Sequence, residues 1–188
     1  AGTDRQTATV QPDQPAEIQV DISDIIAFGR DRLLAQPDSP LIMKALDTGI
    51  NSIRSSSMGR LFDGVSSLLG IKDYNDYEGQ CAIMLEDAAA FAQKNPGADR
   101  KSDLAMDFHN RIIDMIINRC ESIRTETGAS QVALTGGTFQ NKILMEGVLA
   151  KLRERNFQPY YNISVSPNDG GIALGQAFIG MHRRNQWT

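Results

Sequence analysis

The sequence contains few of the residues that bind metals through nitrogen or sulfur. It has only two cysteines and two histidines among 188 residues. Cys81 and Cys120 are far apart, and both lie in apolar, helical patterns. We therefore expect buried free thiols, as in a reducing cytoplasm, rather than a disulfide. With His109 and His182 as the remaining candidates, no zinc-finger spacing is present.

Long apolar runs and an excess of positive charge are also lacking. No segment approaches the roughly 20 apolar residues that a membrane-spanning helix needs, so we expect a soluble, cytoplasmic protein with no membrane partner. Asp and Glu outnumber Lys and Arg by 23 to 19, for a net charge of -4, which argues against a general nucleic-acid-binding surface. The basic stretch 151–155 contains Glu154 and is more typical of a solvated helix face than of a phosphate-backbone site.

The chain begins with a polar stretch and with alanine instead of methionine. Residues 1–15 contain no apolar signal segment, and we expect a flexible leader there. Ala1 suggests a processed product or an excised piece with further sequence upstream. A single compact lobe is expected over residues 16–188.

Helical patterns dominate the chain up to residue 127. Alternating apolar residues predict a short strand over 16–22. Ser23, and Ser39 followed by Pro40, are typical residues at the start of a helix. Apolar residues at helical spacing then predict five helices. These cover residues 23–36, 39–50, 57–69, 79–93 and 102–127.

The last third of the chain has an α/β pattern. Residues 131–135 and 157–165 are predicted to be strands, each followed by a helix, over 141–156 and 172–182 respectively. Such an order favours parallel strands with helices packed on the sheet. Ligands bind such sheets at the carboxyl ends of the strands, where this sequence has two glycine turns.

The first glycine turn is Gly136-Gly137, directly after a predicted strand. Glycine lets a ligand approach the backbone, and the helix start near Asn141 should offer free N–H groups. That combination suits the ribose, phosphate or adenine of a nucleotide. A tight turn without a ligand explains the same residues equally well.

Two aspartates allow both a structural and a functional interpretation. Asp169, before Gly170-Gly171, can cap the last helix or present its carboxylate to a metal bound to phosphate oxygens. Asp63 lies at the edge of an apolar stripe, where an unpaired carboxylate is costly. It can pair with Arg60, three residues earlier, or bind ligand hydroxyls; the ion pair is the favoured reading.

Five motifs, in order, resemble the carboxyl-terminal part of the HypF carbamoyltransferases. They are SSSMGRLFDGVSSLLGI from residue 55, YEGQCAIMLE from 77, FHN from 108, ALTGGTFQN from 133 and NDGGIALGQ from 168. Each motif alone is weak, whereas the ordered set is specific; residues 16–54 are compatible but less diagnostic. The resemblance implies one lobe of the α/β, ribonuclease H-like fold of acetate and sugar kinases, heat-shock proteins and actin, helix-rich with a short, mainly parallel sheet.

The resemblance also assigns site residues. In the relatives, the residues that match Asp63 and Asn141 hydrogen-bond a nucleotide or its adenylate. Those that match Gly79, Gly136 and Gly137 line the pocket. The one that matches Asp169 ligates the active-site metal. The resemblance identifies no residue of this chain as catalytic.

By the same resemblance, the whole enzyme uses carbamoyl phosphate and ATP and forms carbamoyl-adenylate. It transfers the carbamoyl group to the C-terminal cysteine of an acceptor protein of the HypE type, in the maturation of nickel–iron hydrogenase. ATP or AMP and a divalent metal (zinc, iron or magnesium) are the implied cofactors. The sister branch that makes threonylcarbamoyl-adenosine on transfer RNA is an alternative, but Gly-Arg-Leu-Phe-Asp and Gly-Gly-Thr-Phe-Gln-Asn favour the hydrogenase branch. A non-catalytic interaction fragment is a further alternative.

The sequence lacks the His-x-x-x-His pair with which the family's first lobe completes the metal site. We expect His109 to be hydrogen-bonded or packed in a long helix, and His182 to be exposed. Asp169 alone would bind a metal poorly, so weak nucleotide binding without turnover is expected. Surface that would face the missing N-terminal lobe predicts a homodimer or self-association.

Overall fold

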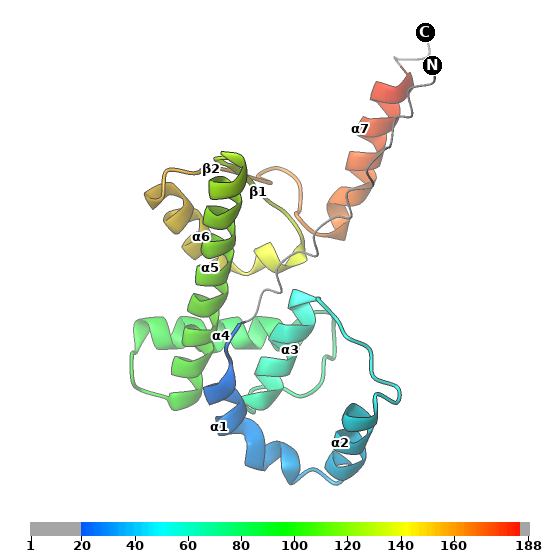
Figure 1. Ribbon diagram of the computed structural model, residues 1–188, viewed down its shortest axis with the longest axis vertical. Helices are drawn as coiled ribbons and strands as arrows, with labels where there is room; N and C mark the ends of the chain where they lie inside the picture. The colour runs from blue at the N-terminus through cyan, green and yellow to red at the C-terminus, as the bar shows by residue number, and fades with distance from the viewer. Residues whose placement is uncertain (1–19, 185–188) are drawn as a thin grey trace, which may run out of the picture.

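The computed structural model describes residues 20–184 and is built mainly from helices (Figure 1). The helices are α1 (Ser23–Leu34), α2 (Ser39–Thr48), α3 (Met58–Leu68), α4 (Gln80–Lys94), α5 (Arg100–Thr127), α6 (Lys142–Glu154) and α7 (Ile172–Arg184). The strands are β1 (Gln131–Leu134) and β2 (Gln158–Tyr161), and the short 3-10 turns are η1 (Gly137–Gln140) and η2 (Asp169–Gly171). All five helices predicted before residue 128 are present.

Helix starts follow the sequence rules only in part. Ser57 caps α3 as a serine at this position should, with its hydroxyl accepting from the Arg60 N–H at 3.4 Å. Ser23 is the first residue of α1 instead of its cap, and its own N–H donates to the Asp21 carboxylate at 2.9 Å. Ser39 likewise begins α2 without capping it.

The strand predicted over residues 16–22 is wrong where the structure describes it. Residues 20–22 form no strand, and residues 16–19 and the predicted leader lie outside the described residues. Val20 and Ile22 instead pack against the core as partly buried side chains. Their alternating apolar pattern therefore reflects burial beside α1 and not pairing with a sheet.

The core lies where α3, α4, α5 and α6 meet. The largest side chains that are fully buried there belong to one cluster, and they are Phe62, Leu69, Leu85, Leu104, Phe108, Ile112, Leu144 and Leu152. Each such side chain contributes about 1.5–3 kcal/mol through removal of apolar surface from water. Gly29 of α1 allows close packing on α3, because a Cβ there would lie 2.2 Å from the Leu68 carbonyl oxygen.

Strands β1 and β2 pair in parallel and are connected through α6 (Figure 1). The ladder runs from Gln131 opposite Gln158 to Leu134 opposite Tyr161. The second strand is shorter than the predicted 157–165, because its partner ends at Leu134 and then turns away. The α/β class and the helix-rich lobe with a short parallel sheet are confirmed. Both glycine turns follow the carboxyl ends of these strands.

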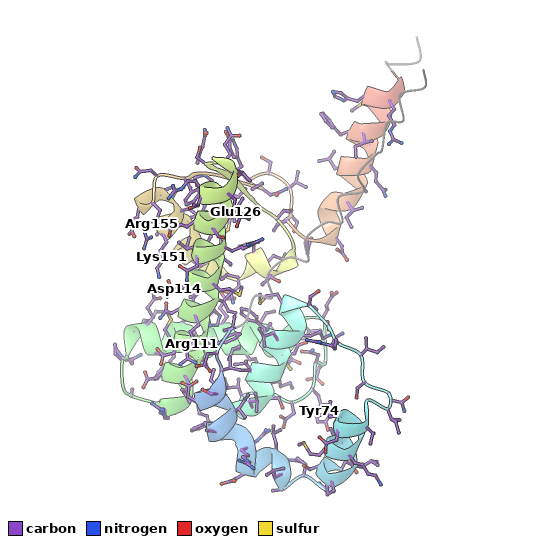
Figure 2. The ribbon with its side chains drawn as sticks, in the orientation of Figure 1. Tyr74, Arg111, Asp114, Glu126, Lys151 and Arg155 are labelled. Carbon is purple, nitrogen blue, oxygen red and sulfur yellow. The ribbon has the colours of Figure 1, made fainter. Side chains whose placement is uncertain are left out.

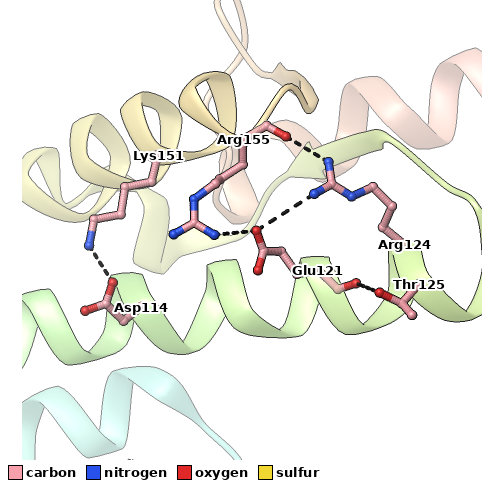
Figure 3. A network of polar contacts seen from close by, with 6 residues as sticks. All are labelled: Asp114, Glu121, Arg124, Thr125, Lys151 and Arg155. Carbon is pink, nitrogen blue, oxygen red and sulfur yellow. Dashed lines mark hydrogen bonds and ion pairs between the residues drawn. The ribbon is translucent and has the colours of Figure 1, made fainter.

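Ion pairs fasten α6 along α5 (Figure 3). Lys151 pairs with Asp114, and the Arg155 guanidinium donates to Glu121 at 2.6 Å. Arg124 donates to the Arg155 carbonyl oxygen at 2.8 Å. The two basic residues at the ends of the 151–155 stretch thus pair with carboxylates of the neighbouring helix. Because they are partly exposed, each pair contributes at most about 1 kcal/mol.

Helix α5 also contacts α1 through Arg111, which is labelled in Figure 2. The Arg111 guanidinium makes two parallel bonds to the Asp24 carboxylate, at 2.6 and 2.7 Å. This paired geometry lowers the pKa of Asp24 below its ordinary value. It joins the first described helix to the longest one.

Helix α7 extends away from the rest of the molecule and packs against η2 (Figure 1). Its apolar side chains are exposed, and so is His182, as expected. Within residues 20–184, no helix has both the length and the apolar character needed to cross a membrane.

A cavity between the two glycine turns and helix α4

One cavity of about 670 Å³ joins segments that are far apart in the sequence. Its size is within the range of small-ligand sites, about 300–1,000 Å³. The residues that line it are Ser57, Gly59, Phe62, Glu78, Gly79, Ala82, Ile83, Glu86, Gly137, Thr138, Gln140, Asn141, Asn168 and Asp169. Four predicted site residues are therefore brought together: Gly79, Gly137, Asn141 and Asp169.

Gly136 connects the two turns through its backbone. It has φ 104° and ψ 155°, a conformation that is essentially limited to glycine. Its N–H donates to the Pro167 carbonyl oxygen at 2.9 Å. Gly136 is therefore next to the cavity wall and holds Gly137 beside Asn168. A Cβ added to Gly137 would lie 3.7 Å from the Asn168 Cβ.

Asn141 caps α6 from within the cavity wall. Its Oδ1 accepts from the Leu144 N–H at 2.8 Å, and its Nδ2 lies 2.9 Å from His109 Nε2. The Lys142 N–H donates to Glu86 at 2.7 Å. The expectation of free N–H groups at this helix start is thus wrong for Lys142 and Leu144, whose N–H groups already have partners within the chain.

The α4 side of the cavity carries two acidic residues that the sequence analysis missed. Glu86 follows Gly79 by two helical turns and therefore lies on the same face of α4. This spacing could have identified Glu86 from the sequence, because Gly79 was already a predicted site residue. Glu78 directly precedes Gly79, which adopts φ 78° at the start of α4. Of the lining residues in the described part of the chain, none is Lys or Arg.

Asp63 lies outside the cavity lining and pairs with Arg60 at 3.6 Å. The favoured ion-pair interpretation is confirmed. Arg60 is largely exposed, so this pair contributes little to stability. The preceding residue, Phe62, provides the apolar wall instead. Binding of a ligand by Asp63 stays a prediction.

Asp169 is exposed at the edge of the cavity. The short turn η2 is capped by Asn168, whose Oδ1 accepts from the Gly170 N–H at 2.9 Å. Within residues 20–184, no group of three or more His, Cys, Asp or Glu residues is arranged to hold a metal ion. The residues present therefore do not fit a metal by themselves, and Asp169 would be a single ligand.

Both cysteines are free thiols; Cys81 is buried as expected, whereas Cys120 is only partly buried. Burial raises the pKa of the Cys81 thiol, and the nearby carboxylates, Asp63 first, act in the same direction. Burial also raises the pKa of Cys120. A raised pKa favours the protonated, less reactive form of a thiol.

The family described as "Carbamoyltransferase, Kae1-like Domain, second subdomain" matches residues 18–100 and 91–176. The chain belongs to the HypF carbamoyltransferase family. It is 32% identical to the carbamoyltransferase HypF of Synechocystis sp. over 69% of its length, and 31% identical to that of Rhodobacter capsulatus over 95%. The resemblance inferred from the five motifs is thereby confirmed.

A solved structure gives the same family assignment. A full-length HypF in a phosphate- and nucleotide-bound form matches 84% of this chain with a TM-score of 0.69 and 33% identity. The chain spans 25% of that structure, and 20% and 26% of the two HypF relatives above. It thus corresponds to about a quarter or less of each of these three proteins.

Proposed function

We propose that this chain is the nucleotide-binding lobe of a carbamoyltransferase in nickel–iron hydrogenase maturation. The enzyme would consume carbamoyl phosphate, ATP and water to form carbamoyl-adenylate, with inorganic phosphate and pyrophosphate as the leaving groups. The thiolate of the C-terminal cysteine of a HypE-type acceptor protein would then attack the carbamoyl carbon, with AMP as the leaving group. Family membership supports the transferase class, and the nucleotide-bound relative supports the ligand.

The cavity between the glycine turns and α4 is the observation that carries this proposal. Its polar lining consists of carboxylates, amides, hydroxyls and backbone groups, with Phe62 and Ile83 as apolar surfaces. Carboxylates and amides can accept and donate to ribose hydroxyls and the adenine amino group. Lys and Arg, which would attract phosphates, do not line it in the described residues. We infer that this lobe binds the adenosine half of the nucleotide.

The phosphates would then extend past Asp169 toward the part of the enzyme outside this chain. Asp169 would offer one carboxylate to a divalent ion there, and the remaining ligands would come from the first lobe. Because that lobe is not part of this sequence, we expect the chain alone to catalyse no carbamoyl transfer.

Calorimetry with adenosine, AMP and ATP tests the proposal. We expect weak binding of adenosine that Asn141→Ala reduces about tenfold, since it removes at least one hydrogen bond and loosens the cavity wall. Asn110→Ala is a matched control, because Asn110 is exposed on α5 and does not line the cavity. Equal losses in the two variants, or none in either, would contradict the site.

Asp63→Asn separates the two roles of that residue. The variant keeps the size of the side chain but loses the charge that pairs with Arg60. If Asp63 binds ribose hydroxyls, adenosine affinity falls several-fold while the midpoint of thermal unfolding stays close to that of the parent protein. An unchanged affinity would limit Asp63 to its ion pair.

A further inference from the structure

His109 is a buried titratable residue that the proposed function does not use. It lies on α5 with 0% of its side chain exposed. The rings of Phe62 and Phe108 stand edge-on to its imidazole, with centroids 5.3 and 5.9 Å away. Phe62 also lines the cavity, so His109 lies directly behind the cavity wall.

The hydrogen bonds of His109 define which nitrogen carries the proton. Nδ1 lies 2.8 Å from the Ala105 carbonyl oxygen, which can only accept, so Nδ1 must be protonated. Burial disfavours the charged imidazolium and lowers the pKa of His109. Burial thus favours the neutral ring, in which the unprotonated Nε2 is an acceptor.

The carboxamide of Asn141 is oriented by the same logic. Its Oδ1 must face the Leu144 N–H, which can only donate. Its Nδ2 then faces His109 and donates one hydrogen to the bare Nε2 at 2.9 Å. A primary amide has two N–H donors and two acceptor positions, so one of each stays available on the residue that lines the cavity.

We propose that His109 is a positioning residue for nucleoside binding, and this rests on the proposed function. It does not touch the ligand. By accepting from Asn141 it fixes the carboxamide plane, so that the second N–H and the second lone pair are held in place in the cavity wall. A neighbouring donor and acceptor of this kind match a ribose hydroxyl or an adenine edge, which offer both functions.

Two substitutions distinguish positioning from simple packing. In His109→Gln, the amide oxygen can take the place of Nε2 as acceptor, whereas His109→Leu fills the space without one. We expect adenosine affinity to fall about tenfold in His109→Leu and to stay within about threefold in His109→Gln. A purely structural role would lower both affinities together with the unfolding temperature.

NMR of the ligand-free full chain tests the geometry independently. The imidazole ¹⁵N shifts should identify a protonated Nδ1 and a bare Nε2, and the two Asn141 side-chain protons should differ strongly in shift and exchange rate. That difference should disappear in His109→Leu and persist in His109→Gln. If His109→Leu does not fold, the parent protein still supplies the imidazole ¹⁵N shifts, and the parent protein and His109→Gln still supply the Asn141 side-chain signals.

Three results would overturn the proposal. One is a proton on Nε2 in place of Nδ1. Another is unchanged Asn141 side-chain signals in His109→Leu. The third is parental adenosine affinity in a folded His109→Leu. If the parent protein binds no nucleoside at all, the proposed function fails, and the NMR signals still decide whether His109 orients Asn141.

Discussion

At the scale of single residues, Gly136 shows how backbone geometry joins the two turns of the cavity. Its φ and ψ lie in a region that a residue with a Cβ adopts only with strain. Its N–H bond to Pro167 holds the turn after β1 against the loop before η2. The sequence indicated a glycine turn here, but not that it would bond to a loop 31 positions later (167 minus 136).

We expect Gly136→Ala to lower the free energy of unfolding by about 1–3 kcal/mol, because alanine must adopt this strained conformation or break the bond to Pro167. Urea unfolding measures the change. Gly64→Ala is the control: Gly64 is in α3, with no atom within 4 Å of an added Cβ and no positive φ. It should stabilise the helix by up to about 1 kcal/mol. Similar losses in both variants would refute the explanation.

His109 makes the stability of the fold depend on pH. Its pKa in the folded protein lies below the ordinary value of 6.5 because of burial. Between those two pKa values the unfolded chain binds a proton that the folded chain does not, so stability falls as the pH decreases through this window. The fall approaches about 1.4 kcal/mol per pH unit.

Chemical unfolding at a series of pH values from neutral downward measures this dependence. His109→Gln lacks the titrating ring and should show a smaller decrease below pH 6.5 than the parent protein does. The carboxylates titrate in both proteins, so the difference between the two curves of unfolding free energy against pH isolates the histidine. Parallel curves would show that His109 is not kept neutral by the fold.

At the scale of secondary structure, local signals predicted the helices well. Cap residues and breakers act through neighbouring backbone: Ser57 caps α3 and Gly128 ends α5, close to the predicted bounds at residues 57 and 127. The strands depended on partners. The second strand ends at Tyr161 because its pairing with β1 ends there. Val20 lies in no strand within the described residues. Strand pairing is a tertiary property that periodicity alone does not contain.

Gly29 decides whether α1 can pack on α3. A Cβ at this position would lie 2.2 Å from the Leu68 carbonyl oxygen, which is backbone and cannot rotate away. We expect Gly29→Ala to reduce the free energy of unfolding by about 1–3 kcal/mol through overpacking. Thermal unfolding compared with Gly180→Ala, where nothing lies within 4 Å, provides the measurement and its control. An unaffected Gly29→Ala would mean that the two helices separate easily.

At the scale of the whole molecule, the lobe exposes many large apolar side chains. On α2 and α7 these include Leu41, Leu46, Leu174 and Phe178, each more than half exposed. A two-stranded sheet is also marginal by itself. The sequence predicted the apolar stripes of these helices but not which would remain uncovered, because that depends on neighbours elsewhere in the fold.

We expect the chain to self-associate as its concentration rises, because association removes such surface from water. Size-exclusion chromatography over a concentration series measures this. The double variant Leu174→Ser and Phe178→Ser should elute later than the parent protein at high concentration, whereas Lys44→Ser, an exposed polar position on α2, should not. A parent protein that elutes as a monomer throughout would contradict the expectation.

The acidic lining of the cavity has an unusual consequence for ionic strength. Glu78, Glu86 and Asp169 would repel the phosphate of AMP, and salt weakens such repulsion as the screening length shrinks from about 10 Å at 0.1 M to about 3 Å at 1 M. Added potassium chloride should therefore tighten AMP binding to this chain while leaving adenosine unchanged, the reverse of what electrolytes do at basic phosphate sites. If AMP binding instead weakens with added salt, positive charge must lie beside the bound phosphate, and the acidic lining does not dominate.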